Sequence, residues 1–416
     1  MFPESTRPTR RPALMNALKT CFILLWALNL YSAEPSPSLA IFDVKAKAGA
    51  QLNIVFFGGS LTWGANATDP QIFSYRARIG DKLQDSYPRS RFHFWDAAIG
   101  GTGSQLGIFR LDRDVLTRKP DLLFLEFTVN DTPINEDRLA SYEAIMRRTI
   151  EAKCPVFVVI LPVKQDVTRR SPNLNHLRHQ ELATSYHVPW VNVTPFILAR
   201  LADGRTQLQD IWANPNWPNP NDATHPSDIG YKLYADAIWE RFGESLKENS
   251  PEIVPAQMLH AETYLHTVRH QIATDVPLPK GWIAGQPDRV AANYDWVMSR
   301  WLDNVAVVKG DRNPASLTYH FTGSTVVLFG ESTMKSGKYR VLIDGNPPNA
   351  KDGQEPGVFD ANATRYGGDA FHVRAIAAGL SEESPHTLVI DPILTSTEEL
   401  RIESICVAGK LPSVER

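Results

Sequence analysis

The sequence predicts an α/β domain built on a parallel sheet, followed by an all-β sandwich domain. Three observations predict this fold class. From about residue 51 to 248, apolar runs of strand length alternate with amphipathic stretches of helical length. Beyond about residue 300 the apolar runs become short and alternating, and Gly, Pro, Asp and Ser bound them. The chain of 416 residues, 43% of them hydrophobic, is long enough to bury a core in each of two domains.

The first domain is expected over residues 45–250. Strands are expected at 51–58, 91–99, 121–129, 155–163 and 188–193, and helices at 73–87, 107–119, 136–153, 173–186 and 226–246. Continuous apolar strands separated by amphipathic helices are typical of a parallel sheet that is covered on both faces. The prediction is therefore a three-layer α/β/α domain, in which ligands bind at the carboxyl ends of the strands.

The second domain is expected over residues 301–411. Its strands are expected at 316–323, 324–331, 337–345, 386–392 and 400–409. Short alternating strands with turn-forming boundaries are typical of an antiparallel sandwich. Residues 251–300 follow neither pattern, and we interpret them as a connector that wraps one domain or begins the second.

The first 33 residues have the layout of a secretory signal peptide. Lys19 precedes an apolar run from Cys21 to about Leu30, which is too short to span a bilayer and is followed by small residues and Pro. We interpret residues 1–14 as an extension upstream of Met15. The prediction is a secreted or periplasmic protein, and an uncleaved anchor that tethers it to a membrane is the alternative.

The composition excludes some partners. A formal net charge of −3 and scattered basic residues give no basic field, so nucleic acid is not expected as a partner. Outside the signal segment only Cys154 and Cys406 remain, and we expect both to be buried apolar side chains. We interpret the three histidines of “HAETYLHTVRH” as lying on the solvent-exposed face of a helix, because the zinc pattern HExxH is absent. No cofactor and no metal are expected.

Two motifs follow the first two predicted strands. “FFGGSLTWGA” places Ser60 in a turn after the first strand, where Gly58 and Gly59 permit a tight backbone. “WDAAIGGTGSQLG” places glycines, Gly100 and Gly101 among them, before a helix, where backbone N–H groups face a ligand. Taken alone, the serine is more often a helix cap, and the glycines also allow a dinucleotide site.

Two further motifs follow the third strand and precede the last helix. “LEFTVNDT” places Asn130 and Asp131 after the third strand, and “NDATHPSDIGY” places Asp222 three residues before His225. Each alone is ordinary turn chemistry. Together the four motifs predict a serine hydrolase site at one edge of the sheet, in which Ser60 attacks an ester, His225 transfers the proton and Asp222 orients the imidazole.

The oxyanion of such a reaction needs fixed hydrogen-bond donors. The backbone N–H groups of Ser60 and Gly101 and the side-chain amide of Asn130 are the predicted donors. Gly100 is the competing assignment within the glycine motif. Some Asn-X-Ser/Thr triplets, one at Asn66, matter only in a host that glycosylates.

These four motifs, in this order, resemble the SGNH hydrolase superfamily of GDSL-like esterases and lipases. The resemblance covers about residues 51–248 and implies a flavodoxin-like sheet, a cofactor-independent esterase, and the roles given above for Ser60, Gly101, Asn130, Asp222 and His225. Two positions depart from the family pattern. Gly59 replaces the aspartate of GDSL, and Val129 replaces the glycine before the asparagine. We expect these departures to adjust the level of activity rather than to abolish it.

The substrate class follows from weaker observations. Trp63 lies beside the serine, and Trp212 and Trp217 lie in an Asn- and Pro-rich stretch before the DxxH motif, so all three are candidate substrate-binding residues; packing is the alternative. A secreted serine esterase joined to a jelly-roll-like sandwich resembles the carbohydrate esterases, which implies an O-acyl, chiefly O-acetyl, sugar or polysaccharide as substrate. An acyltransferase with the same site, or a glycan-binding protein with a decayed hydrolase domain, are the alternatives.

Overall fold

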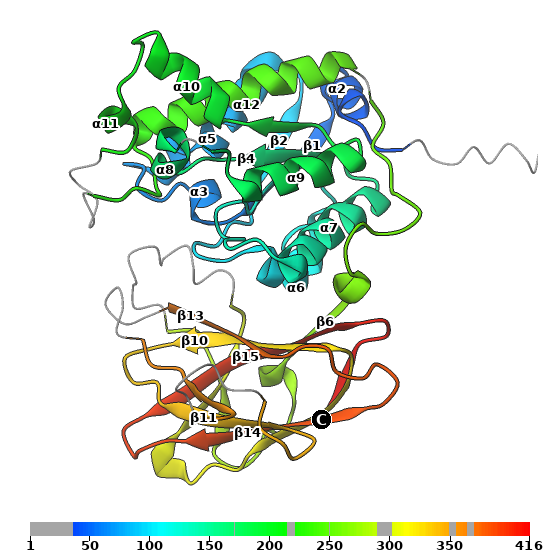
Figure 1. The fold of residues 1–416 in the computed structure, drawn as a ribbon. Coiled ribbons are helices and arrows are strands. Elements are labelled where there is room, and N and C mark those ends of the chain that lie inside the picture. Colours follow the sequence, from blue (N-terminus) through cyan, green and yellow to red (C-terminus); the bar gives the residue numbers. More distant parts are fainter. Residues whose placement is uncertain are drawn as a thin grey trace, which may run out of the picture. The chain divides into compact units, whose positions relative to one another are not determined.

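A five-stranded parallel sheet forms the centre of the α/β part (Figure 1). The computed structural model describes residues 36–169, 171–213, 221–248, 250–288, 302–348, 355–363 and 370–416. The strands are β1 (Gln51–Gly58), β2 (Arg91–Asp96), β3 (Leu122–Glu126), β4 (Val156–Ile160) and β5 (Trp190–Asn192), in the order β2-β1-β3-β4-β5. This is the flavodoxin-like order, and the predicted α/β/α fold is confirmed.

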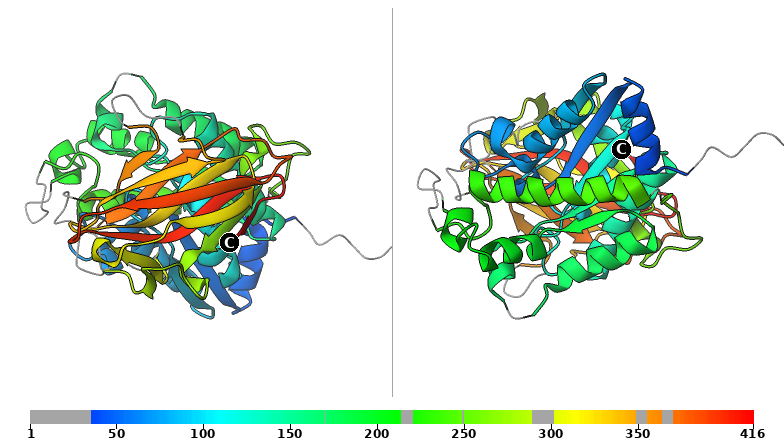
Figure 2. Two further views of the ribbon diagram at one scale, coloured as in Figure 1. Left: turned by 90° about the horizontal axis from the view of Figure 1, so that it is seen from below. Right: turned by 90° about the horizontal axis from the view of Figure 1, so that it is seen from above.

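Helices cover both faces of this sheet. They are α2 (Leu39–Lys47), α3 (Ser60–Trp63), α4 (Pro70–Phe73), α5 (Tyr75–Ser86), α6 (Ser104–Asp114), α7 (Glu136–Glu151), α8 (Lys164–Thr168), α9 (Leu174–Ser185), α10 (Thr194–Ala202), α11 (Leu208–Ile211) and α12 (Asp228–Glu248), with the 3₁₀ turn η1 (Leu116–Arg118) after α6. Helices α2, α5 and α12 pack on one face, and Figure 2 shows α12 lying across the strands. Helices α6, α7 and α9 pack on the other face.

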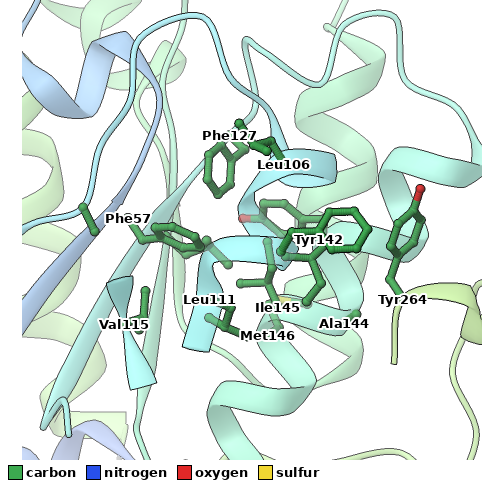
Figure 3. Packing of buried hydrophobic residues seen from close by; sticks show 14 of the residues in the cluster. Phe57, Leu106, Leu111, Val115, Phe127, Tyr142, Ala144, Ile145, Met146 and Tyr264 are labelled. Carbon is green, nitrogen blue, oxygen red and sulfur yellow. The ribbon is translucent and has the colours of Figure 1, made fainter. Parts of the chain in front are cut away.

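The alternation of side chains along β1 explains the two cores. Ile54 and Phe56 point into the cluster under α12, whereas Val55 and Phe57 point into the cluster under α6 and α7. Figure 3 shows Phe57 among apolar side chains of α6 and α7, including Tyr142. Because both faces are buried, the strand reads as a continuous apolar run, and its observed bounds equal the predicted ones.

Two antiparallel sheets form the C-terminal part, as predicted. The first has the order β13-β10-β15-β8-β7, with β6 also pairing β15, and the second has the order β12-β11-β14-β9-β16. Their strands are β6 (His266–Gln271), β7 (Trp282–Gly285), β8 (Val305–Lys309), β9 (Leu317–Thr322), β10 (Thr325–Ser332), β11 (Lys338–Ile343), β12 (Val358–Asp360), β13 (Ala370–Ala377), β14 (His386–Ile393), β15 (Glu399–Gly409) and β16 (Ser413–Glu415). The short 3₁₀ turn η2 (Glu262–Tyr264) precedes β6, and η3 (Ile272–Thr274) and η4 (Gly310–Arg312) lie between strands.

The two faces of the first antiparallel sheet contact different surroundings. Along β10, Val326 and Leu328 pack in the core shared with the second sheet. Val327 and Phe329 belong instead to the cluster that contains Phe57 of the α/β part. The apolar cluster under α6 and α7 therefore continues into the sandwich.

Residues 251–300 were expected to wrap one domain or to begin the second, and their described part contributes β6 and β7 to the first antiparallel sheet. One sequence expectation differs from the structure. The helix face expected for the histidines is wrong, because His266 and His270 lie in β6, where pairing with β15 supplies backbone partners that the local sequence does not reveal. Cys154 and Cys406 are buried and free, as expected.

The N-terminal prediction cannot be compared with the fold. The predicted signal peptide, residues 1–33, lies outside the described residues. Within the part of the chain that the structure describes, no helix combines the length and apolarity needed to cross a membrane.

Candidate active site

Ser60 lies in a tight turn directly after β1. It is the first residue of α3, only 6% of it is exposed, and Gly59 precedes it in extended conformation. A Cβ atom on Gly58 would lie 2.2 Å from Thr62 Oγ1 and 2.5 Å from the Glu126 carbonyl oxygen, so only glycine fits there. The turn closes through Gly64, whose φ of +100° is left-handed and favours glycine.

Asp222 and His225 form a second tight turn before α12. Asp222 Oδ1 accepts the backbone N–H groups of Thr224 at 2.8 Å and His225 at 3.0 Å. This turn folds the imidazole back, so that His225 Nδ1 lies 2.6 Å from Asp222 Oδ2. Burial alone would raise the pKa of Asp222, but hydrogen bonds from the His225 side chain and from this backbone lower it to about 2. The three-residue spacing of the motif is therefore the spacing that this turn requires.

The two turns meet at the carboxyl edge of the sheet. Ser60 Oγ lies 2.8 Å from His225 Nε2. Because the Nδ1–H group donates to Asp222, Nε2 is left to accept the serine proton. The chain thus brings together Ser60, His225 and Asp222 across 165 residues of sequence in the geometry of a nucleophile, a base and an orienting carboxylate.

The two predicted oxyanion loops approach the serine turn, since a Cβ atom on Gly59 would lie within 4 Å of atoms from each loop. Gly101 has a φ of +74°, a left-handed value that favours glycine, whereas Gly100 has no positive φ. This difference favours Gly101 as the glycine that the motif requires. Asn130 lies so close to Gly59 that a Cβ atom there would be 2.1 Å from Asn130 Oδ1. The missing side chain at residue 59 therefore leaves the room that the Asn130 amide occupies.

Asn66 is a site residue that the sequence reasoning missed. Its backbone is left-handed, with a φ of 72°, and its buried side chain donates from Nδ2 to the His225 carbonyl oxygen at 2.7 Å. The sequence showed only an Asn-X-Thr triplet. A preference of asparagine for left-handed turns is the one local signal of this role. Asn66 thus ties the loop after α3 to the turn that holds His225.

Glu126 lies buried under the serine turn. It is fully buried at the end of β3, where its Oε2 accepts the Thr62 hydroxyl at 3.2 Å, and Thr62 Oγ1 lies 2.9 Å from the Tyr75 hydroxyl. Burial raises the pKa of Glu126 to about 7, although the Thr62 hydroxyl and backbone N–H groups act to lower it. The sequence reasoning did not single out this carboxyl group.

The structure describes two of the three tryptophans that were predicted to bind substrate. Trp63 is 4% exposed and packs with Ala65 and Ala98, and Trp212 is 3% exposed and packs under α12. Because both rings are buried, packing is favoured over substrate binding as the role of these two tryptophans. Trp217 lies outside the described residues. Instead, Phe371 of β13 approaches the site, since a Cβ atom on Gly101 would lie 3.1 Å from two of its ring carbons.

Comparisons with known proteins show a family match for the α/β part and a similar fold for most of the chain. Residues 56–233 match the GDSL-like Lipase/Acylhydrolase family. The fold is similar to that of a two-domain esterase (CEX) active on acetylated mannans. Its structure co-crystallized with mannopentaose is 23% identical, with a TM-score of 0.72, and the match covers 91% of this chain and 96% of that chain. A second structure of it is 24% identical, with a TM-score of 0.70 and coverage of 90% and 96%.

Two other comparisons found weak similarity or none. A structure of Axe2, an acetylxylan esterase from Geobacillus stearothermophilus, is 20% identical, with a TM-score of 0.38, and covers 47% of this chain and 96% of that chain. No curated protein matches the sequence. The similarity of fold over about nine tenths of the chain therefore comes from the two-domain structures.

The close approach of Gly59 and Asn130 generates a first prediction. In Gly59→Ala the new methyl group must displace the Asn130 amide. Complete loss of one oxyanion donor costs about 100- to 1000-fold in kcat, and a displaced donor is only partly lost, so we expect kcat for p-nitrophenyl acetate to fall about 10- to 100-fold. Gly243→Ala is the matched control, because a Cβ atom there meets nothing within 4 Å. Equal kcat values for the two variants would contradict the prediction.

The contact between Asn66 and His225 generates a second prediction. Asn66→Gly keeps a residue that tolerates the left-handed backbone but removes the donor to the His225 carbonyl. We expect kcat/KM to fall about 10-fold, because the imidazole loses part of its support, and the unfolding free energy to fall by about 1 kcal/mol. Steady-state kinetics and urea unfolding measure the two effects. A loss of stability with unchanged kcat/KM would show that Asn66 supports only the loop.

The raised pKa of Glu126 generates a third prediction. The folded state keeps this proton between pH 4.5, the ordinary value, and about 7, whereas the unfolded state has lost it, so this group lowers stability as pH rises through that window. Glu126→Gln cannot ionise. We therefore expect the unfolding free energy of the variant, relative to the unmodified protein, to rise by up to about 3 kcal/mol across the window.

Urea unfolding at several pH values between about 4.5 and 7.5 measures this difference. The exposed Glu355→Gln is the control for the loss of one carboxyl group. Parallel pH profiles for Glu126→Gln and the unmodified protein would mean that folding does not raise the pKa of Glu126.

Proposed function

We propose that the protein is a secreted serine esterase that removes O-acetyl groups from a carbohydrate; the match of residues 56–233 to the GDSL-like Lipase/Acylhydrolase family supports this proposal. The observation that carries the proposal is the chain of contacts from Ser60 Oγ to His225 Nε2, at 2.8 Å, and from His225 Nδ1 to Asp222, at 2.6 Å. A serine hydroxyl is a weak nucleophile until a base accepts its proton. Here the base lies at hydrogen-bond distance and is itself oriented.

The first half-reaction forms an acyl-enzyme. Ser60 Oγ attacks the ester carbonyl carbon while His225 Nε2 takes the hydroxyl proton, and the Asp222 carboxylate stabilises the resulting imidazolium. The carbonyl oxygen becomes an oxyanion, which accepts hydrogen bonds from the N–H groups of Ser60 and Gly101 and from the Asn130 amide. Collapse of the tetrahedral intermediate expels the sugar alcohol, which takes its proton from His225.

The second half-reaction releases the acid. His225 Nε2 takes a proton from water, whose oxygen attacks the acyl carbon bonded to Ser60 Oγ. The same donors hold the second oxyanion. The breakdown of this intermediate returns the proton to Ser60 and frees acetate. Each proton transfer uses the one imidazole, which explains why a single, firmly tied histidine is sufficient.

A carbohydrate substrate is supported by two observations. The two-domain structures with a similar fold over about nine tenths of this chain belong to an esterase active on acetylated mannans. The β part of this chain places the half-buried Phe371 against Gly101, so a sugar that presents its ester to Ser60 passes beside residues of both parts. Acetylated mannan is therefore the first polysaccharide to assay.

A kinetic comparison of Ser60→Ala with the unmodified protein tests this proposal. We expect hydrolysis of p-nitrophenyl acetate and release of acetate from acetylated mannan to fall at least about 1000-fold in Ser60→Ala, because the nucleophile is lost. Ser185→Ala, an exposed serine on α9, is the matched control and should keep full activity. Acetylated xylan and pectin, and the butyrate and octanoate esters, then define the substrate range.

Three outcomes would change the proposal. Equal activity of Ser60→Ala and the unmodified protein would overturn the serine mechanism. Cleavage of p-nitrophenyl acetate without acetate release from any of the three polysaccharides would overturn the carbohydrate substrate alone. Acetyl groups found on an added sugar, with little free acetate, would identify transfer rather than hydrolysis.

A further inference from the structure

Asp131 directly follows Asn130, and its side chain is buried. It is 0% exposed, and its Oδ1 accepts the backbone N–H of Ser104 at 2.8 Å. Ser104 is the first residue of α6, and the residue before it, Gly103, has no side chain that can cap the helix. Asp131 therefore supplies, from a different loop, the helix cap that the local sequence lacks.

This contact joins the two loops that carry the proposed oxyanion donors. Gly101 lies three residues before Ser104, and Asn130 is bonded to Asp131. The loops also touch directly, since a Cβ atom on Gly103 would lie 2.5 Å from Asp131 Oδ1 and 3.2 Å from the Asn130 carbonyl oxygen. The separation of the two loops is thus set by one buried carboxyl group and by the absence of one side chain.

The surroundings of Asp131 leave it little freedom to move. Its backbone N–H donates to the Phe127 carbonyl oxygen at 2.9 Å, and its Oδ2 lies 3.5 Å from Nε2 of the buried His179. His179 in turn lies 3.1 Å from the Thr128 hydroxyl through Nδ1, and it stacks on the ring of Tyr142 with centroids 4.0 Å apart. A group held from several sides can act as a fixed spacer between loops.

We propose that Asp131 is a positioning residue, which holds the Gly101 N–H and the Asn130 amide at the separation that lets both donate to one oxyanion. The inference rests on the proposed serine mechanism. Donors help only where they converge on the developing charge, and a misplacement of about 1 Å can cost about 100-fold in rate. Asp131 does not touch substrate in this scheme, so its effect is expected on kcat rather than on KM.

Substitution of Asp131 tests the proposal. In the full chain we expect Asp131→Ala to lower kcat for p-nitrophenyl acetate about 10- to 100-fold, with KM within about threefold of the unmodified value. Asp131→Asn keeps an oxygen at the Oδ1 position as an acceptor for Ser104, so we expect it to recover most of the lost rate. The p-nitrophenol burst gives the concentration of competent sites, and kcat is expressed per site.

Two further variants separate positioning from folding. In Gly103→Ala the new Cβ atom would lie too close to Asp131 and Asn130 of the other loop. We therefore expect a similar loss of kcat, which can be measured even if Asp131→Ala does not fold. Ser141→Ala is the matched control: Ser141 Oγ lies 2.8 Å from Ser104 Oγ, at the same helix start, but does not contact the backbone N–H. We expect it to lower the melting temperature without changing kcat.

The outcomes divide clearly between the two hypotheses. If Ser60→Ala is inactive while Asp131→Ala or Gly103→Ala keeps full kcat per site, the positioning role is overturned and the serine mechanism stands. If Asp131→Asn is as slow as Asp131→Ala, retention of the acceptor has not rescued the rate, and the positioning role is also overturned. If Ser60→Ala is itself active, the proposed function fails and the positioning role fails with it.

Discussion

The parallel register between β1 and β3 is the constraint on which the site depends. It sets Gly58 opposite Glu126, so the serine turn after β1 and the loop after β3 leave the sheet side by side. Because parallel strands bring their carboxyl ends to one edge, both loops open on the same side, where the turn before α12 delivers His225. A shift of one residue in this register would turn the apolar side chains of β3 to the wrong core and separate the two loops.

The loops at this edge are held by polar groups that the interior would ordinarily exclude. Glu126 lies under the serine turn and Asp131 under the two proposed oxyanion loops, and both are fully buried. A buried carboxyl group costs stability unless it is hydrogen-bonded or protonated. Glu126 keeps its proton to about pH 7, and Asp131 accepts a backbone N–H. A functional edge that is built from such groups sacrifices some stability for fixed geometry.

The C-terminal sandwich is joined to the α/β part through an apolar core. One cluster contains Phe57 of β1 together with Val327 and Phe329 of β10. This cluster also contains apolar side chains of α6 and α7, and Phe371 of β13 lies against Gly101. The second part therefore belongs to the surroundings of the site and is more than an independent appendage.

Short-range patterns in the sequence encode the local geometry of the fold and of the site. The apolar run of β1, the turn glycines around Ser60 and the three-residue spacing of Asp222 and His225 each express a local geometry, namely a buried strand, a tight turn and a carboxylate that accepts the next backbone N–H groups. These patterns were sufficient to predict the fold class and to identify Ser60, Asp222 and His225, which meet at the site.

The contacts that hold the site together join residues that are far apart in the sequence. Asn66 meets His225 across 159 residues, and Asp131 caps α6 across 27, so α6 begins at Ser104 rather than at the predicted residue 107. Likewise β6 is a strand because β15 supplies its partner, although its own sequence is polar. Local propensity and periodicity carry no information about a partner that the fold supplies from elsewhere in the chain, and for that reason these assignments required the folded structure.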